Sequence, residues 1–219
     1  MPNRERRLYL SRQSIPAIMY VLFGGLMMAT PYLVEHNGYN ESVMVAREGL
    51  PAPFDQALVL IGGHTVGGAT GIMLNKPLSA QDHDKLSAFL RDSGLTVSYG
   101  GPIAVSEKVF VLEERKETPD DKNPDFDLKE WDIAIRDNPD LINAIRKSDK
   151  NNEHHYRIFT GYAAWRPFQL EIEVMLKQAW RPVTTTHDLV FQTDPASHWD
   201  AVNRREQDKL RKANPPDQS

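Results

Sequence analysis

Short apolar runs alternate with amphipathic stretches along most of the chain. Each short run is bounded by glycine or polar turn residues, which predicts a buried strand rather than a helix. The predicted strands are Ala57–Ile61, Gly71–Leu74, Val97–Tyr99, Val109–Leu112, Trp131–Ile135, Tyr156–Thr160 and Leu189–Phe191.

Apolar side chains at three- and four-residue spacing predict helices between these strands. Ser79 begins the first helix as a cap, with Asp82 three residues later, and Gly94 ends it. The others are predicted over 138–146, over 169–179 and from Pro195 onward. The 169–179 helix is expected to contribute apolar surface through Leu170, Ile172, Val174 and Met175.

An uncharged stretch from Ser14 to Val34 precedes this pattern, with arginines before it and acidic residues after it. It is long enough for a membrane helix, because about 20 apolar residues cross a hydrocarbon layer of ~30 Å. The arginines favour a cytoplasmic N-terminus and an extracytoplasmic domain, periplasmic or equivalent. A cleaved signal peptide and a buried soluble helix are the alternatives to this anchor.

Small residues within this stretch, Gly24, Gly25 and Ala29, would allow close packing of another membrane helix. The expected partners are therefore the lipid bilayer and a membrane protein complex, bound through the transmembrane helix and the domain surface.

The pattern predicts an α+β fold, a compact domain with a central mixed β-sheet and flanking helices, preceded by one transmembrane helix. The chain then divides into a basic segment (1–14), the transmembrane helix (15–34), a linker and domain entry (35–53), the α/β domain (54–212) and a flexible tail (213–219).

Composition removes several kinds of chemistry. The chain has 219 residues and no cysteine, which excludes disulfides, thiolate nucleophiles and cysteine-ligated metals. Its net charge of −4 provides no global basic field, so no nucleic-acid partner is expected.

Catalytic motifs are also missing from the sequence. The glycine-rich segment 62–71 lacks the lysine of a phosphate loop and the G-x-G of a dinucleotide site, and it predicts a hairpin. The adjacent His154 and His155 would point to opposite faces of a strand, so they do not suit one metal ion. We therefore predict no catalytic residue, no metal and no cofactor.

Three unusual loops remain as a candidate ligand site. An asparagine and a lysine at a strand end can donate hydrogen bonds, paired glycines allow close backbone approach, and aromatic rings provide flat walls. If the loops share a cleft, the ligand-binding residues are Asn75, Lys76, Gly100, Gly101, Pro102, Tyr162 and Trp165.

These loops, in this order, resemble the AlgH/YqgE family (UPF0301, domain DUF179) over roughly residues 43–202. The motifs that carry the resemblance are the strand 54–61 with His64, the segment Gly71–Pro77 ending in Asn-Lys-Pro, the turn Gly100–Pro102, and Gly161–Trp165 followed by Gln169, Leu170 and Glu173. The chain departs from the family pattern at Gly63, Glu113 and Phe168. The resemblance implies a compact α+β fold with a central sheet and provides no catalytic residues.

Three functions follow as hypotheses. The first is a membrane-anchored, non-catalytic accessory or scaffolding subunit of a membrane protein complex. The second is a small-ligand-binding or hydrolytic domain that uses the three loops. The third is a transcriptional regulator, a label that the resemblance carries. The family also implies the alternative of a cytoplasmic domain.

Overall fold

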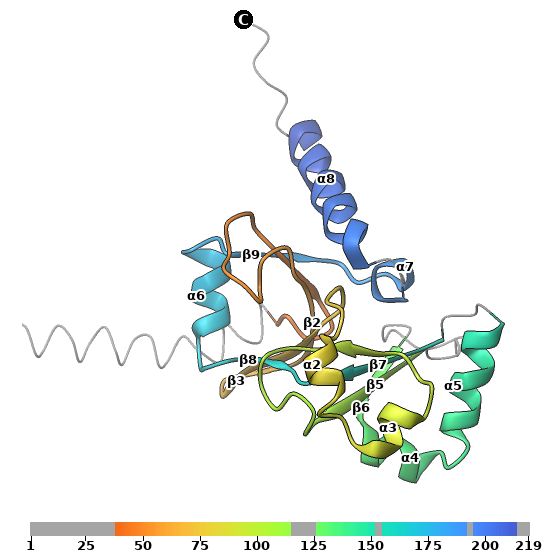
Figure 1. The fold of residues 1–219 in the computed structure, drawn as a ribbon. Coiled ribbons are helices and arrows are strands. Elements are labelled where there is room, and N and C mark those ends of the chain that lie inside the picture. Colours follow the sequence, from red (N-terminus) through yellow and green to blue (C-terminus); the bar gives the residue numbers. More distant parts are fainter. Residues whose placement is uncertain (1–37, 115–125, 152–154, 192–194, 214–219) are drawn as a thin grey trace, which may run out of the picture. The chain divides into compact units, whose positions relative to one another are not determined.

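The computed structural model describes residues 38–114, 126–151, 155–191 and 195–213, and those from Tyr39 onward belong to one compact unit. Its strands form two sheets (Figure 1). The first sheet is antiparallel, in the order β8 (Ala163–Trp165), β3 (Gly68–Met73), β2 (Leu58–Thr65), β1 (Val43–Ala46) and β9 (Trp180–Val183). The second sheet is mixed, in the order β4 (Val97–Tyr99), β7 (Tyr156–Thr160), β5 (Val109–Glu114) and β6 (Phe126–Glu130).

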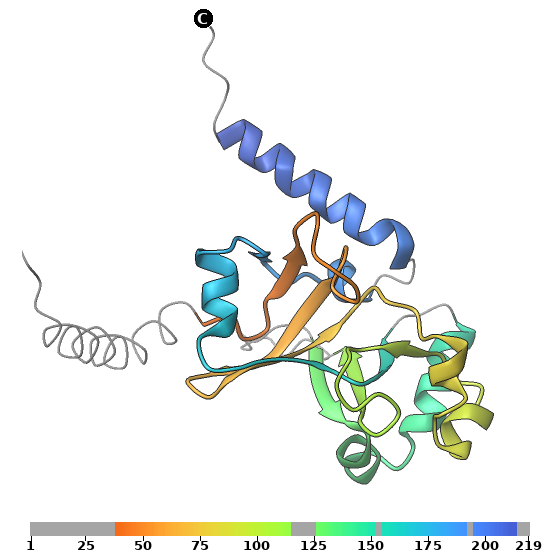
Figure 2. The same ribbon diagram turned by 60° about the vertical axis from the view of Figure 1, so that its left-hand side comes forward.

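The helices have ten residues or fewer, apart from α8 with 19. They are α2 (Ala80–His83), α3 (Ala88–Asp92), α4 (Trp131–Asp137), α5 (Leu141–Lys150), α6 (Gln169–Met175), α7 (His187–Phe191) and α8 (Pro195–Ala213). The view in Figure 2 shows α6 on the side of the first sheet and α4 and α5 on the side of the second.

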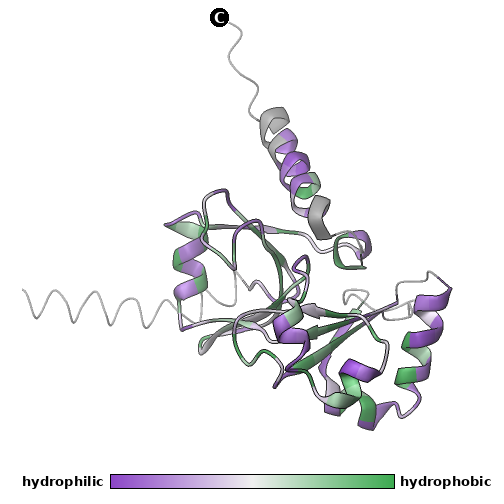
Figure 3. Ribbon diagram, viewed as in Figure 1, coloured by the Kyte–Doolittle hydropathy of each residue, from purple (hydrophilic) through white to green (hydrophobic). Residues whose placement is uncertain are grey.

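Both sheets bury both of their faces, which explains the uninterrupted apolar runs. In β1, Val43 and Val45 pack between the two sheets with Leu112 and Phe159, whereas Met44 faces the α6 side. On the outer face of the second sheet, a separate apolar cluster includes residues of α4 and α5. The order of layers is therefore α6, first sheet, second sheet, then α4 with α5. Figure 3 shows apolar colouring along parts of the strands and on parts of α4, α5 and α6.

A buried hydrogen bond attaches the last helix to the first sheet. The indole N–H of Trp199 donates to the Ala46 carbonyl at 2.8 Å, and Trp199 is 4% exposed. The coloured middle turns of α8 are mostly hydrophilic in Figure 3.

The predicted fold class is wrong in two respects. The strands form two sheets rather than one central mixed sheet, because the first sheet's strands pair only antiparallel and the parallel pair, β4 with β7, lies in the second. In addition, no helix within the described ranges is both long enough and apolar enough to cross a membrane. The stretch 15–34, with Gly24, Gly25 and Ala29, lies outside the described residues. The expected topology and membrane partners are not tested.

Two predicted strands are helices instead. Trp131, Ile133 and Ile135 alternate as in a strand, but the structure packs Trp131, Ala134 and Ile135 on one face and leaves Ile133 39% exposed, which is helical spacing. Residues 189–191 belong to α7, and all three are buried, so no periodicity distinguished this short helix from a strand.

The first predicted helix is confirmed at its start and is interrupted later. Ser79 accepts a hydrogen bond from the Asp82 backbone N–H at 3.1 Å, as a capping residue does. The chain then forms two short helices, since Ser87 caps α3 separately. The strand β1 falls within the stretch expected as linker and domain entry.

Candidate functional site

Asn75 and Lys76 fasten the loop that leads into β2. The buried Asn75 side chain accepts from the Leu58 backbone N–H at 2.8 Å and donates to the Gln56 carbonyl at 2.8 Å. The Lys76 ammonium group donates to the Asp55 carbonyl at 2.5 Å and lies 3.3 Å from the Asp55 carboxylate. Both side chains therefore already have protein partners.

The two glycine loops cross each other with their backbones in contact. A Cβ atom on Gly100 would lie 2.3 Å from the Gly161 carbonyl oxygen, and one on Gly101 would lie 2.2 Å from the Tyr162 carbonyl carbon. Gly101 also has a φ of +151°, so a side chain there would be strained as well as crowded. The glycines are needed for this crossing, where the chain passes from β7 to β8. Pro102 follows it and is exposed.

Trp165 belongs to a third group, centred on Glu173 of α6. The indole N–H groups of Trp165 and Trp180 both donate to Glu173 Oε2 at 2.9 Å, and the Gln169 amide donates to Oε1 at 2.9 Å. The two indole rings meet edge to face, with centroids 5.8 Å apart. We call this cluster the Glu173 clamp. It explains the W…Q-L-x-x-E spacing, because the tryptophan and the glutamine of that motif both donate to its glutamate.

The seven predicted ligand residues thus fall into three groups, each with structural contacts of its own. Tyr162 joins the glycine crossing and packs edge to face on Phe110, with ring centroids 6.1 Å apart. Neither of the two pockets described below is lined by any of the seven. Their role in ligand binding stays a prediction.

A buried histidine and a glutamate form a pair that no sequence motif indicates. His64 is 3% exposed and contacts Glu171 of α6. The Tyr39 backbone N–H donates to His64 Nδ1 at 3.1 Å, so Nε2 carries the proton and donates to Glu171 Oε1 at 2.9 Å. Burial, and then the Glu171 charge, raise the pKa of Tyr39. In the sequence, His64 stands out only through the family resemblance. The resemblance does not indicate burial, so the buried pair was not predicted.

One side of α6 carries exposed apolar side chains. Ile172 is 42% exposed, Met175 55% and Leu176 77%. The spacing of three and four residues places them on one side of α6 and of its C-cap residue, Leu176, a surface that we call the α6 face. Ile172 and Met175 were expected to contribute apolar surface; the structure directs this surface to solvent, because Leu170 and the Glu173 clamp occupy the inner side.

Two pockets lie elsewhere on the unit. The larger, of about 690 Å³, lies among β4, β7 and α5, with Arg157 in its lining. Arg157 donates to the carbonyls of Leu74 at 2.5 Å and Val190 at 2.6 Å, and burial lowers its pKa to about 10. The smaller, of about 330 Å³, lies under α8.

Histidines and a carboxylate also meet near the end of β5. Glu114 contacts the imidazole of His155 and lies 3.0 Å from His187 Nε2. Among the residues that the structure describes, no group of three or more histidine, aspartate or glutamate side chains is arranged to hold a metal ion.

Comparisons with known proteins agree on one family. The AlgH-like family profile, DUF179, matches residues 43–211. A UPF0301 protein of Rickettsia prowazekii is 28% identical over 192 residues, which cover 83% of this chain and 87% of that protein. A UPF0301 protein of Shewanella loihica is 26% identical over 153 residues, covering 67% and 78% of the two chains.

Two solved structures share the fold. The solution structure of the AlgH protein from Pseudomonas aeruginosa superposes with a TM-score of 0.53 at 18% identity, over 83% of this chain and 95% of that one. A crystal structure of a Corynebacterium diphtheriae protein gives a TM-score of 0.55 at 19% identity, over 75% and 85%. Since the family profile spans most of the chain, this protein belongs to the AlgH-like family.

Proposed function

We propose that this chain is a non-catalytic accessory subunit that binds a partner protein through the α6 face. The observation that carries the proposal is the solvent exposure of Ile172, Met175 and Leu176 on one side of a short helix. Grouped apolar side chains on a surface mark binding sites more often than single ones do. Methionine is also enriched at interfaces, because its flexible thioether adapts to a partner.

The α6 face is not required for the fold. The opposite side of the helix supplies the packing, through Leu170, which is 1% exposed, and through Glu173 with its three donors. Replacing an apolar side chain on the α6 face should therefore change stability little. Its exposure needs another explanation, and partner binding provides one.

The helix is held rigidly, which favours binding. Glu171 and Glu173 connect α6 to His64 on β2 and to Trp180 on β9, so two strands of the first sheet fix it in place. A surface that is ordered before binding loses less conformational entropy when the partner docks. The two glutamates thus act indirectly, by presenting the α6 face.

The test is recovery of the native partner with tagged full-length protein. Burying one leucine side chain contributes roughly 1.5–3 kcal/mol, so Leu176→Ser should weaken the complex about tenfold or more. The matched control is Ile133→Ser, which changes an exposed apolar residue on α4 beside the other sheet. Equal loss of the partner in both variants, or full retention in Leu176→Ser, would contradict the proposal.

A further inference from the structure

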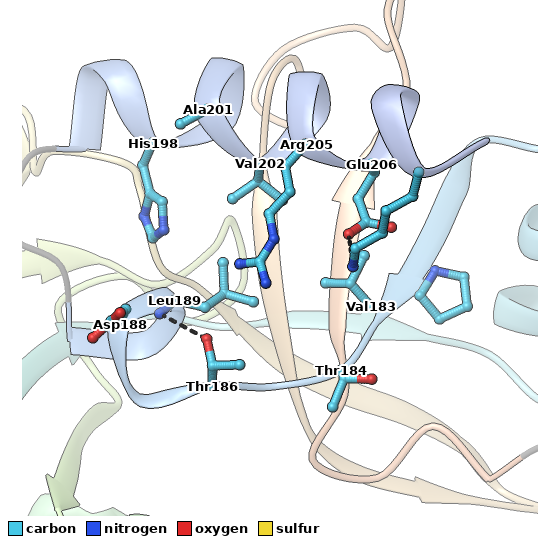
Figure 4. Close-up of a pocket in the computed structure, with 12 residues that line it drawn as sticks. Val183, Thr184, Thr186, Asp188, Leu189, His198, Ala201, Val202, Arg205 and Glu206 are labelled. Atoms are coloured by element: carbon cyan, nitrogen blue, oxygen red, sulfur yellow. Dashed lines mark hydrogen bonds and ion pairs between the residues drawn. The ribbon is translucent and has the colours of Figure 1, made fainter. Parts of the chain in front are cut away.

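The pocket under α8 has the features of an anion site. It lies between α8 and the segment that runs from the end of β9 into α7, and its volume is about 330 Å³ (Figure 4). Pockets of this size accommodate small molecules. We propose that it binds the phosphate group of a small phosphate monoester, with Arg205 as the principal charged contact.

Arg205 is the residue on which the proposal depends. Figure 4 shows its guanidinium group extending from α8 into the pocket, toward the side where Thr186 and Leu189 lie. Within the described parts of the chain, Arg205 makes no hydrogen bond or ion pair, although acidic side chains line the same pocket. An arginine fork directed into a concave site is suited to a phosphate oxyanion, because its N–H groups pair with two oxygens.

Hydroxyl groups on the opposite wall supply further donors. Thr186 Oγ1 accepts from the Leu189 backbone N–H at 3.3 Å, so the hydroxyl hydrogen of Thr186 can be donated elsewhere. Thr184 also lines the pocket. Donors from α8 and from the loop would therefore approach a bound anion from two sides, which suits a tetrahedral phosphate.

The two acidic residues of the pocket lie next to cationic or imidazole groups other than Arg205. Glu206 pairs with Lys209, whose ammonium group lies 2.6 Å from Glu206 Oε1. The Asp188 side chain is fully exposed and lies 3.7 Å from His187 Nδ1. Neither carboxylate forms an ion pair with Arg205.

Additional positive charge lies next to the pocket on β9. Burial lowers the pKa of Arg181, and the charge of Glu206 opposes this shift while that of Arg47 adds to it. The Arg181 side chain donates to Asn203 of α8 at 3.0 Å, while its buried Nε has no hydrogen-bond partner. The pocket lining itself carries two cations, Arg205 and Lys209, and two carboxylates, Asp188 and Glu206, so Arg181 adds positive charge beside a balanced lining.

The experiment is titration of the full-length protein with inorganic phosphate, followed by NMR, at ionic strength held constant with chloride. Saturable shifts of the Thr184, Thr186 and Arg205 amides are expected. Arg205→Gln should weaken binding about tenfold or more, because it removes a charge-assisted pair. Arg204→Gln is the matched control, since Arg204 is the neighbouring exposed arginine on α8 and does not line the pocket.

The outcomes separate the alternatives. Equal weakening by Arg204→Gln and Arg205→Gln would show general charge attraction and would overturn the proposal, as would an absence of saturable binding. Binding of acetate as tight as that of phosphate would overturn the phosphate assignment. Glycerol 3-phosphate and vesicles containing phosphatidic acid, titrated in parallel, distinguish a soluble ester from a lipid headgroup. Retention of phosphate binding in Leu176→Ser separates this site from the proposed protein-binding surface.

Discussion

Removing the carboxylate of Glu173 should destabilise the domain more than most single changes. In Glu173→Ala, the indole N–H groups of Trp165 and Trp180 lose their shared acceptor, and both tryptophans are at most 6% exposed. A hydrogen bond to a charged group contributes about 1.5–3 kcal/mol, and two are lost together with the Gln169 contact. We expect the free energy of unfolding to fall by about 3–5 kcal/mol, a large share of a typical total of roughly 5–15 kcal/mol.

The measurement is urea-induced unfolding of the full chain, followed by tryptophan fluorescence and by circular dichroism. Glu173→Gln retains one acceptor oxygen, so it should lose roughly half as much as the alanine variant. Met175→Ala, two positions later and exposed, is the matched control and should stay within about 0.5 kcal/mol of the wild type. A loss below about 1 kcal/mol in Glu173→Ala would refute the clamp, because the indole donors would then not depend on this carboxylate.

Three further variants test other parts of the account. Gly101→Ala should prevent folding, judged by circular dichroism, because its Cβ would lie 2.2 Å from the Tyr162 backbone; Gly94→Ala, which also has a positive φ but nothing within 4 Å, should lose only about 1 kcal/mol. His64→Ala should cost about 2–3 kcal/mol in urea unfolding by leaving Glu171 unpaired, with partial recovery in His64→Gln; an unchanged midpoint would argue against the pair. Burial lowers the pKa of Arg157 to about 10, so above that pH the unfolded chain binds more protons and this group's contribution to stability rises with pH. Arg157→Met should lack that rise when unfolding is compared at about pH 8 and about pH 11, and an identical pH dependence would count against it.

Much of the fold could be predicted from local patterns. The runs at 57–61, 109–112 and 156–160 are strands, because β-branched and aromatic residues between turn signals fit few other structures. The division into two sheets was not predictable, since it depends on which strands pair across the glycine crossing. The α7 helix was also missed, because complete burial removes the periodicity on which such predictions rely.

The candidate site shows a similar limit. The sequence singled out the Asn-Lys-Pro, Gly-Gly-Pro and Gly161–Trp165 loops, but it could not show which atoms they contact. Asn75 accepts a hydrogen bond from the Leu58 backbone at the start of β2, and Trp165 donates one to Glu173. The first contact joins residues distant in the chain, and the second joins residues across a turn. The exposure of the α6 face could not be predicted either. The helical period identifies two apolar sides of this helix, but it does not show which side faces solvent.

Site-specific photo-crosslinking in cells tests the proposed function most directly. A photoreactive amino acid replaces Leu176 in one full-length variant and Ile133 in another, because both side chains are exposed and they lie beside different sheets. We expect one discrete crosslinked protein from position 176 that is absent from position 133. No adduct at position 176, or the same adducts at both positions, would contradict it.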